Sequence, residues 1–249
     1  MIQTTNALIL RSSLFRETSQ ILTFLTQDFG KIHTLAKGAR RGAHRFGSTF
    51  ELFTCNRIVF YERRHSELQL LSQCDLVDSF PAIRADLKKT AYAVYFSELV
   101  DRATAAGDRS GPTYTLFLEA LREASQRATL EETARIFEAK FLSCSGWMPE
   151  FSQCLRCRGA LTLRCALSLR KGGTFCERCS KGEEGLLGLS RGTLVSIRHL
   201  VEVPWELAYR MRMSRQGREE LKETLKRFID YHIDEKIMSR DFLKELEKL

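Results

Sequence analysis

The pattern of apolar and polar positions divides the chain into two parts that meet near residue 80. Before that point, short apolar runs are separated by polar or glycine-containing turns, a pattern typical of β-strands. The five runs with the clearest strand character span residues 7–10, 21–25, 31–35, 57–61 and 68–71. Because all five precede the first helical pattern, we expect residues 1–80 to form a small β-barrel.

Apolar residues recur at helical spacing after Pro81, which suits the first turn of a helix. We expect this helix to end at Gly107 and a later one to end at Gly146. Ser190 and Ser214 are expected to cap two helices of the C-terminal part. The predicted helical segments are 81–107, 112 onward, 129–146, 190–203, 214–239 and a short terminal helix from 241. The fold class is therefore α+β.

Two Cys-x-x-Cys pairs, separated by eighteen residues, carry the clearest chemical signal. They are Cys154-Leu-Arg-Cys157 and Cys176-Glu-Arg-Cys179. Each pair can close a tight turn that directs both sulfurs the same way, so four thiolates can surround one tetrahedral zinc ion. Because a protein ligand fills every position, no place is left for an activated water. The metal is therefore expected to hold the fold and to perform no chemistry.

Two disulfides in a secreted domain are the alternative for these four cysteines. The first residues, Met1-Ile-Gln-Thr-Thr-Asn, lack the basic and then apolar pattern of a secretory signal peptide. We therefore expect a cytoplasmic protein, where thiols stay reduced, and favour zinc. Cys165 lies in the same loop and is an alternative metal ligand, but it has no paired cysteine and is interpreted as a small apolar residue. The cysteines interpreted as core residues are Cys55, Cys74 and Cys144.

The composition is that of an ordinary globular protein, with 43% hydrophobic and 28% charged residues. No apolar run approaches the roughly 18 residues of a membrane span, so no membrane association is expected. Lys and Arg together number 39 and Asp and Glu number 31, which gives a net charge of +8. This surplus of positive charge favours a polyanion as partner.

A basic, glycine-containing segment free of carboxylates runs from residue 31 to residue 45. Its glycines let backbone amides approach an anion, and Phe46, Phe60 and Tyr61 are expected to offer faces for base stacking nearby. We interpret the segment, together with the next hairpin, as a clamp for a nucleic-acid backbone. The alternative is an ordinary solvated surface. The candidate DNA-binding residues are Lys31, Lys37, Arg40, Arg41, Arg45, Arg57, Arg63 and Arg64.

Motifs for phosphate chemistry are missing from the sequence. It contains neither a Gly-x-x-x-x-Gly-Lys-[Ser/Thr] loop nor a Gly-x-Gly-x-x-Gly turn, and it offers no nucleophile with a recognisable base. We therefore expect a binding protein and not an enzyme, with no catalytic residues.

Four further stretches are distinctive: Ala7-Leu-Ile-Leu-Arg, Thr26-Gln-Asp-Phe-Gly-Lys-Ile-His-Thr-Leu-Ala-Lys-Gly-Ala-Arg-Arg, Ala91-Tyr-Ala-Val-Tyr-Phe-Ser-Glu-Leu-Val-Asp and Gly146-Trp-Met-Pro. Through these stretches the chain resembles the bacterial RecO family of recombination mediators over nearly its whole length. The lysine-glycine-alanine-arginine-arginine block is the most specific of these. The sequence departs from the family at Arg158, where the family often has glycine directly after the second cysteine.

The resemblance implies an N-terminal OB-fold barrel over residues 1–80 and an α-helical domain over 81–249, with a zinc module inserted at about 150–184. It implies binding to single- and double-stranded DNA and annealing of complementary strands. It also implies loading of the RecA recombinase onto strands coated by single-stranded DNA-binding protein (SSB), with RecR as partner. The same resemblance implies a contact with the acidic, hydrophobic C-terminal tail of SSB and a location at the bacterial nucleoid.

Two other classes of protein share some of these features. A zinc-ribbon transcription or translation factor would have the same metal site and the same basic charge. A metal hydrolase would need an open ligand position and a general base, and the sequence has no His-Glu-x-x-His motif. We therefore rank the hydrolase last.

Overall fold

The computed structural model describes residues 1–39, 46, 50–63, 66–109, 111–161 and 164–246. The chain forms two compact units. The first comprises Met1–Leu130 together with Ile237–Leu249, and the second comprises Glu131–Lys236. The barrel strands end near residue 80 as predicted, but the helices that follow directly belong to the same compact unit as the barrel.

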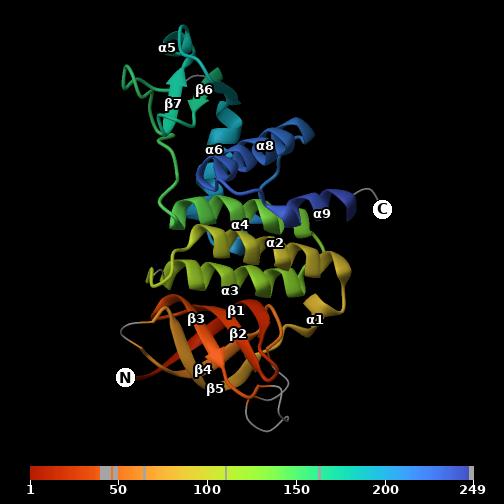
Figure 1. Cartoon of the computed structure of the whole chain (residues 1–249). Helices are drawn as coiled ribbons and strands as arrows, with labels where there is room; N and C mark the ends of the chain where they lie inside the picture. Colours follow the sequence, from red (N-terminus) through yellow and green to blue (C-terminus); the bar gives the residue numbers. More distant parts are fainter. Residues whose placement is uncertain (40–45, 47–49, 64–65, 110, 162–163, 247–249) are drawn as a thin grey trace. The chain divides into compact units, whose positions relative to one another are not determined.

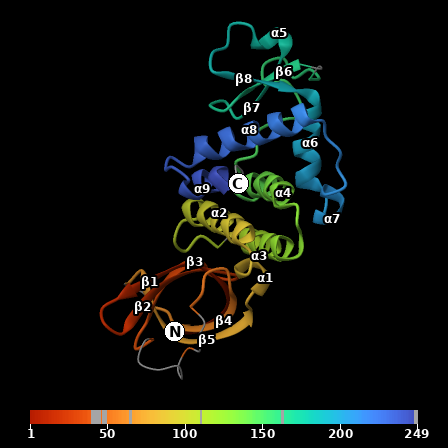
Figure 2. The ribbon, with the colours of Figure 1, turned by 90° about the vertical axis from the view of Figure 1, so that its right-hand side faces the viewer.

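The first unit begins with a closed five-stranded barrel in the order β1-β2-β3-β5-β4, which confirms the predicted OB-like architecture (Figures 1 and 2). Strands β3 and β5 pair in parallel, and the other neighbours pair antiparallel. The strands are mostly longer than the apolar runs that predicted them. Their bounds are β1 Ile2–Phe15, β2 Ser19–Thr26, β3 Gly30–Ala36, β4 Cys55–Tyr61 and β5 Leu68–Asp78.

The barrel interior is filled by apolar side chains that include Ile9, Phe24 and Ile58, all fully buried. Phe46 and Phe60 belong to this core, so the expectation that they offer stacking faces is wrong. Only one of two successive strand residues can face the interior, and on β4 that residue is Phe60, which leaves Tyr61 43% exposed.

The helices of the first unit are α1 Pro81–Arg84, α2 Leu87–Ala103, α3 Gly111–Gln126 and α9 Met238–Leu246. The single helix predicted from Pro81 is interrupted, because the Asp86 side chain caps a new helix by accepting from the Lys89 amide at 3.0 Å. The C-terminal helix docks on α2, where the Glu98 carboxylate accepts from the backbone amides of Met238 and Ser239.

The helices of the second unit are α4 Leu130–Cys144, α5 Glu177–Ser180, α6 Arg191–Glu202, α7 Trp205–Ala208 and α8 Arg215–His232. Ser190 and Ser214 cap α6 and α8 as predicted, each accepting from an amide three residues on. Gly146 follows α4 with φ +70°, the left-handed conformation expected of a residue that ends a helix.

A small sheet in the order β7-β6-β8 completes the second unit, and it was not predicted from the sequence. Its strands are β6 Arg164–Ser168, β7 Gly173–Cys176 and β8 Leu186–Ser190. Cys165 lies buried on β6, and its thiol contacts the Leu189 carbonyl oxygen at 3.1 Å. Cys55 and Cys74 are buried as predicted. Cys144 is exposed, so its assignment to the core is wrong: the chain leaves the core in the last turn of α4, where Ser143 is exposed too.

Candidate metal centre and nucleic-acid interface

The four paired cysteines come together in the second unit. The sulfurs of Cys154, Cys157, Cys176 and Cys179 all lie within 4.8 Å of one another, and Cys157 and Cys176 are separated by 3.9 Å. Four sulfurs placed tetrahedrally at a Zn–S distance of about 2.3 Å would be about 3.8 Å apart. The donor set and its spacing therefore fit a closed tetrahedral metal site.

Backbone hydrogen bonds shape the turn that carries the first two sulfurs. The Arg158 amide donates to the Cys154 carbonyl at 2.9 Å, and the Cys154 amide donates to the Gly159 carbonyl at 3.0 Å. This turn requires φ +57° at Arg158, a conformation that suits glycine better. The site thus keeps its geometry at the position where the sequence departs from the RecO pattern.

The second pair of cysteines is placed by the end of β7 and the start of α5. Cys176 is the N-cap residue of α5, and Cys179 lies within that short helix. The Leu155 amide donates to the Thr174 carbonyl at 2.8 Å and ties the two turns together. A Cβ at Gly173 would lie 2.8 Å from the Leu155 side chain, so the close approach needs glycine there.

Two thiols of the cluster have pKa values shifted in opposite directions. Burial raises the pKa of Cys154, but the backbone amides of Cys157, Cys176 and Arg156 together lower it to about 6. Burial and hydrogen bonds to the neighbouring thiols raise the pKa of Cys179 to about 12. A divalent cation would favour the thiolate form of Cys179 and so offset this rise in its pKa.

The candidate DNA-binding residues fall into three groups. Lys37, Arg57 and Arg63 are exposed, and their side chains have no ion-pair partner in the described part of the chain. Arg57 projects from β4, Lys37 directly follows β3, and Arg63 lies two residues beyond β4. Outside the described residues lie Arg40, Arg41, Arg45 and Arg64.

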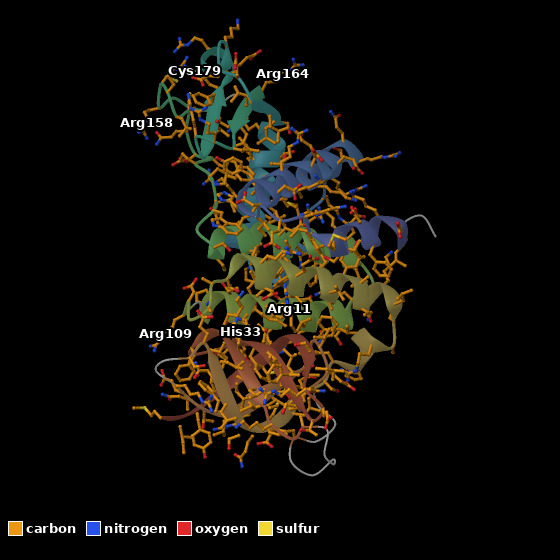
Figure 3. All side chains as sticks on the ribbon, in the orientation of Figure 1. Arg11, His33, Arg109, Arg158, Arg164 and Cys179 are labelled. Carbon is orange, nitrogen blue, oxygen red and sulfur yellow. The ribbon has the colours of Figure 1, made fainter. Side chains whose placement is uncertain are left out.

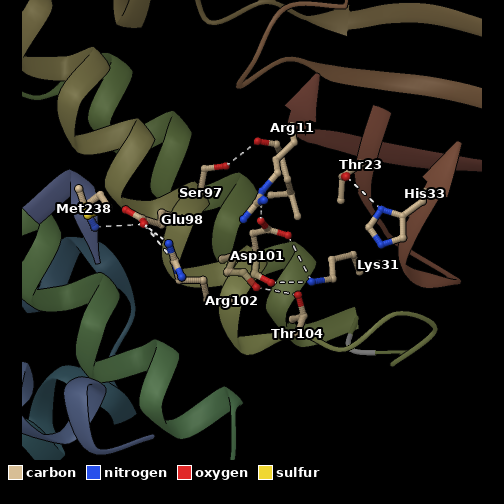
Figure 4. A network of polar contacts seen from close by, with 12 residues as sticks. Arg11, Thr23, Lys31, His33, Ser97, Glu98, Asp101, Arg102, Thr104 and Met238 are labelled. Carbon is tan, nitrogen blue, oxygen red and sulfur yellow. Dashed lines mark hydrogen bonds and ion pairs between the residues drawn. The ribbon is translucent and has the colours of Figure 1, made fainter. Parts of the chain in front are cut away.

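Lys31 forms the third group, because its ammonium is engaged within the first unit. It donates to the Asp101 carbonyl at 2.5 Å and contacts the Asp101 carboxylate at 3.2 Å, and its side chain is only 12% exposed (Figure 4). The Arg11 guanidinium pairs with the same carboxylate from β1. Asp101 thus fastens two barrel strands to α2, and Lys31 contributes to packing.

A pocket of about 100 Å³ in the second unit was missed by sequence reasoning. Its apolar lining includes Ile136 of α4, Leu200 of α6 and Leu221 of α8. Arg212 also lines the pocket and, among the residues that the structure describes, has no hydrogen-bond partner. Because four helices and the segment between α7 and α8 supply the lining, no local spacing in the sequence predicts it.

Both parts of the chain match models of known protein families. Residues 1–80 match the family model "Recombination protein O N terminal", and residues 84–241 match "Recombination protein O C terminal". The chain therefore falls in a class of recombination proteins. In the described ranges, no helix has both the length and the apolar character needed to span a membrane.

Individual relatives agree with the family models. A protein of Symbiobacterium thermophilum named "DNA repair protein RecO" is 31% identical over 247 residues, which cover 97% of this chain and 96% of the relative. A protein of the same name from Pelotomaculum thermopropionicum is 30% identical over 238 residues, covering 96% of this chain and 92% of the relative. The chain belongs to the RecO family of DNA repair proteins.

Proposed function

We propose that the protein is a recombination mediator that binds single- and double-stranded DNA and anneals complementary strands. With RecR, it helps load RecA onto SSB-coated single strands at the nucleoid of the bacterial cytoplasm. The observation that carries the proposal is an OB-like barrel of the RecO family with exposed cations on its surface. No catalytic step is part of this function.

The DNA contact is made by a clamp on the barrel, defined as Lys37, Arg57 and Arg63 together with Arg40, Arg41, Arg45 and Arg64 of the adjoining segments. The described members have no carboxylate partner, so their charge is available to phosphates. Contacts to the backbone do not read the sequence. A clamp of this kind therefore accepts any strand, as annealing requires.

The metal of the four-cysteine cluster is zinc, and its role is structural. The strands of the module around it are only four or five residues long, so metal binding supplies folding free energy, roughly 10 to 16 kcal/mol in comparable peptides. Four sulfur ligands leave no open coordination position.

The pocket of the second unit receives the C-terminal tail of SSB. An acidic and hydrophobic peptide matches an apolar lining beside a guanidinium that has no partner among the described residues. Exchanging Arg212 for Glu should weaken binding of a fluorescent SSB-tail peptide at least tenfold, since the change replaces attraction by repulsion. Arg210→Glu is the matched control, because Arg210 is exposed but does not line the pocket. Equal weakening in both variants, or in neither, would argue against this site.

Strand annealing tests the function as a whole. Two complementary oligonucleotides, bare or coated with SSB, should anneal faster with the protein and without ATP, and RecR should promote RecA filament formation on the coated strand. An RNA competitor of the same length separates a DNA mediator from a zinc-ribbon translation factor. Annealing that needs ATP hydrolysis, or no annealing at all, would contradict the proposal.

A further inference from the structure

A cavity of about 300 Å³ opens on the barrel where β3 and β5 separate. These strands pair along His33–Leu35 and Leu68–Leu70, and the part of β3 near Gly30 instead forms an isolated bridge, between Lys31 and Ala106. Phe29, Ile32 and Phe60 contribute apolar lining to the cavity. The Phe29 ring meets the Phe60 ring edge to face, with centroids 5.4 Å apart.

The segment between α2 and α3 forms another wall of the cavity, beside the barrel strands. The Gly107 amide donates to the Lys31 carbonyl at 2.9 Å. Gly30, with φ +67°, lets this segment come so close that a Cβ there would lie 1.8 Å from the Asp108 carbonyl oxygen. The wall is therefore fixed to β3, and it carries Arg109 to the cavity mouth, at the same end of the barrel as His33 (Figure 3).

Arg109 lies over an aromatic ring, and its positive charge is not neutralised by any described residue. Its guanidinium carbon is 5.9 Å from the centroid of Phe29, which is only partly buried. Arg109 is exposed, and the described residues include no hydrogen-bond or ion-pair partner for it. A guanidinium plane and an aromatic ring side by side offer two surfaces on which a flat ring can stack.

The remaining polar groups of the cavity select against an anion. Glu62 and Glu67 both line it, and the Glu62 carboxylate accepts from Gln3 at 3.0 Å. The Lys31 ammonium is held by Asp101 and is not available to an anion. One nitrogen of His33, Nδ1, contacts the Thr23 hydroxyl at 3.0 Å, which leaves Nε2 for another partner. The preferred occupant is thus flat and uncharged, with polar edges.

We propose that this cavity receives one unstacked base of single-stranded DNA, an inference that rests on the proposed DNA binding and gives it a base-contacting subsite. The volume suits a single small ring system, since ligand pockets begin at about 300 Å³. The base stacks against Arg109 and Phe29, while its phosphates stay outside the acidic interior. A paired base inside a duplex cannot enter, so the subsite acts on single strands.

The acidic groups also select among bases. Adenine, cytosine and guanine each carry an exocyclic amino group that can donate to a carboxylate, and thymine does not. Glu67 is exposed at the cavity and, within the described ranges, its carboxylate has no partner. Unpaired thymine has only its ring N3–H to donate, whereas an amino group has two N–H donors, so the subsite favours an amino-bearing base over thymine.

The test compares Arg109→Gln with wild type in fluorescence anisotropy titrations on three probes. These are oligo(dC), an oligomer of abasic sugar phosphates of the same length, and a duplex. The variant should bind oligo(dC) about fivefold more weakly, the lower end of what one stacked base contributes. The variant should bind the abasic oligomer and the duplex with the same affinity as wild type. Arg122→Gln, an equal charge change at an exposed position of α3, is the control and should affect no probe.

Equal weakening of Arg109→Gln on oligo(dC) and the abasic oligomer would mean a phosphate contact and would overturn the subsite. No weakening on either probe would overturn it as well, while leaving DNA binding by the clamp intact. If wild type binds none of the three probes, the proposed function itself fails. A second variant, Glu67→Gln, should bring the affinities for oligo(dC) and oligo(dT) closer together. An unchanged ratio, or equal affinities in wild type, would refute the selection among bases.

Discussion

The salt dependence of DNA binding gives the most direct test of the clamp. Each Lys or Arg that neutralises a phosphate of a single strand releases condensed counterions, so log affinity falls with log salt by about 0.7 per contact. Arg57 and Arg63 are exposed members of the clamp without ion-pair partners in the described part of the chain. Arg57→Gln with Arg63→Gln removes both charges and keeps polar, though shorter, side chains.

The double variant should therefore flatten the slope by about 1.4 units. The advantage of wild type over the variant should then shrink about sevenfold between 50 and 200 mM salt. Arg40 and Arg41, which lie outside the described residues, should together contribute a similar 1.4 units. Because backbone contacts carry no sequence information, the loss should be the same on mixed, purine-rich and pyrimidine-rich strands.

The matched control exchanges Lys88 and Arg122 for Gln, two exposed positions on α2 and α3 of the same unit. It changes the net charge equally, so it isolates a local contact from a general effect of charge. Anisotropy titrations at several salt concentrations supply the slopes, and circular dichroism checks folding. Equal changes of slope in both double variants would refute the clamp.

Three further predictions concern the stability of the two units. Cys176→Ser should lower bound zinc measured by mass spectrometry and reduce the melting temperature; a metal-free wild type of undiminished stability would contradict a structural role. Arg158→Gly should stabilise the metal module by about 1 kcal/mol, because glycine adopts φ +57° without strain, and chelator titration measures the gain. Burial raises the pKa of Glu98, but Ser239, Met238 and Arg102 outweigh it and lower the pKa from 4.5. The docking of α9 should therefore be complete above pH 4.5 and weaken as the pH falls below it, as seen by hydrogen exchange in α9 at graded acid pH.

Local patterns predicted the barrel, most helices, two serine caps and the two cysteine pairs that cluster, because each depends on spacing within a short segment. The small sheet β7-β6-β8 was not predictable in this way, since its strands are only four or five residues long and lie among glycines and cysteines. Neither was the role of Lys31, whose partner Asp101 lies far along the chain on α2. For Phe60 and Tyr61, alternation showed that they face opposite ways but not which one faces the core.

The return of α9 to the first unit makes the second unit an insertion. The chain leaves the first unit after Leu130 and re-enters it at Ile237, so both chain ends belong to one folded body. The inserted body is consequently attached by two covalent crossings, and a single proteolytic cut within it would leave the halves of the first unit held by packing such as that of α9 on α2. Excision of 131–236 with a bridging linker is the natural way to obtain the first unit in isolation. A conventional truncation after α3 would remove α9 as well and expose the surface of α2 that it covers.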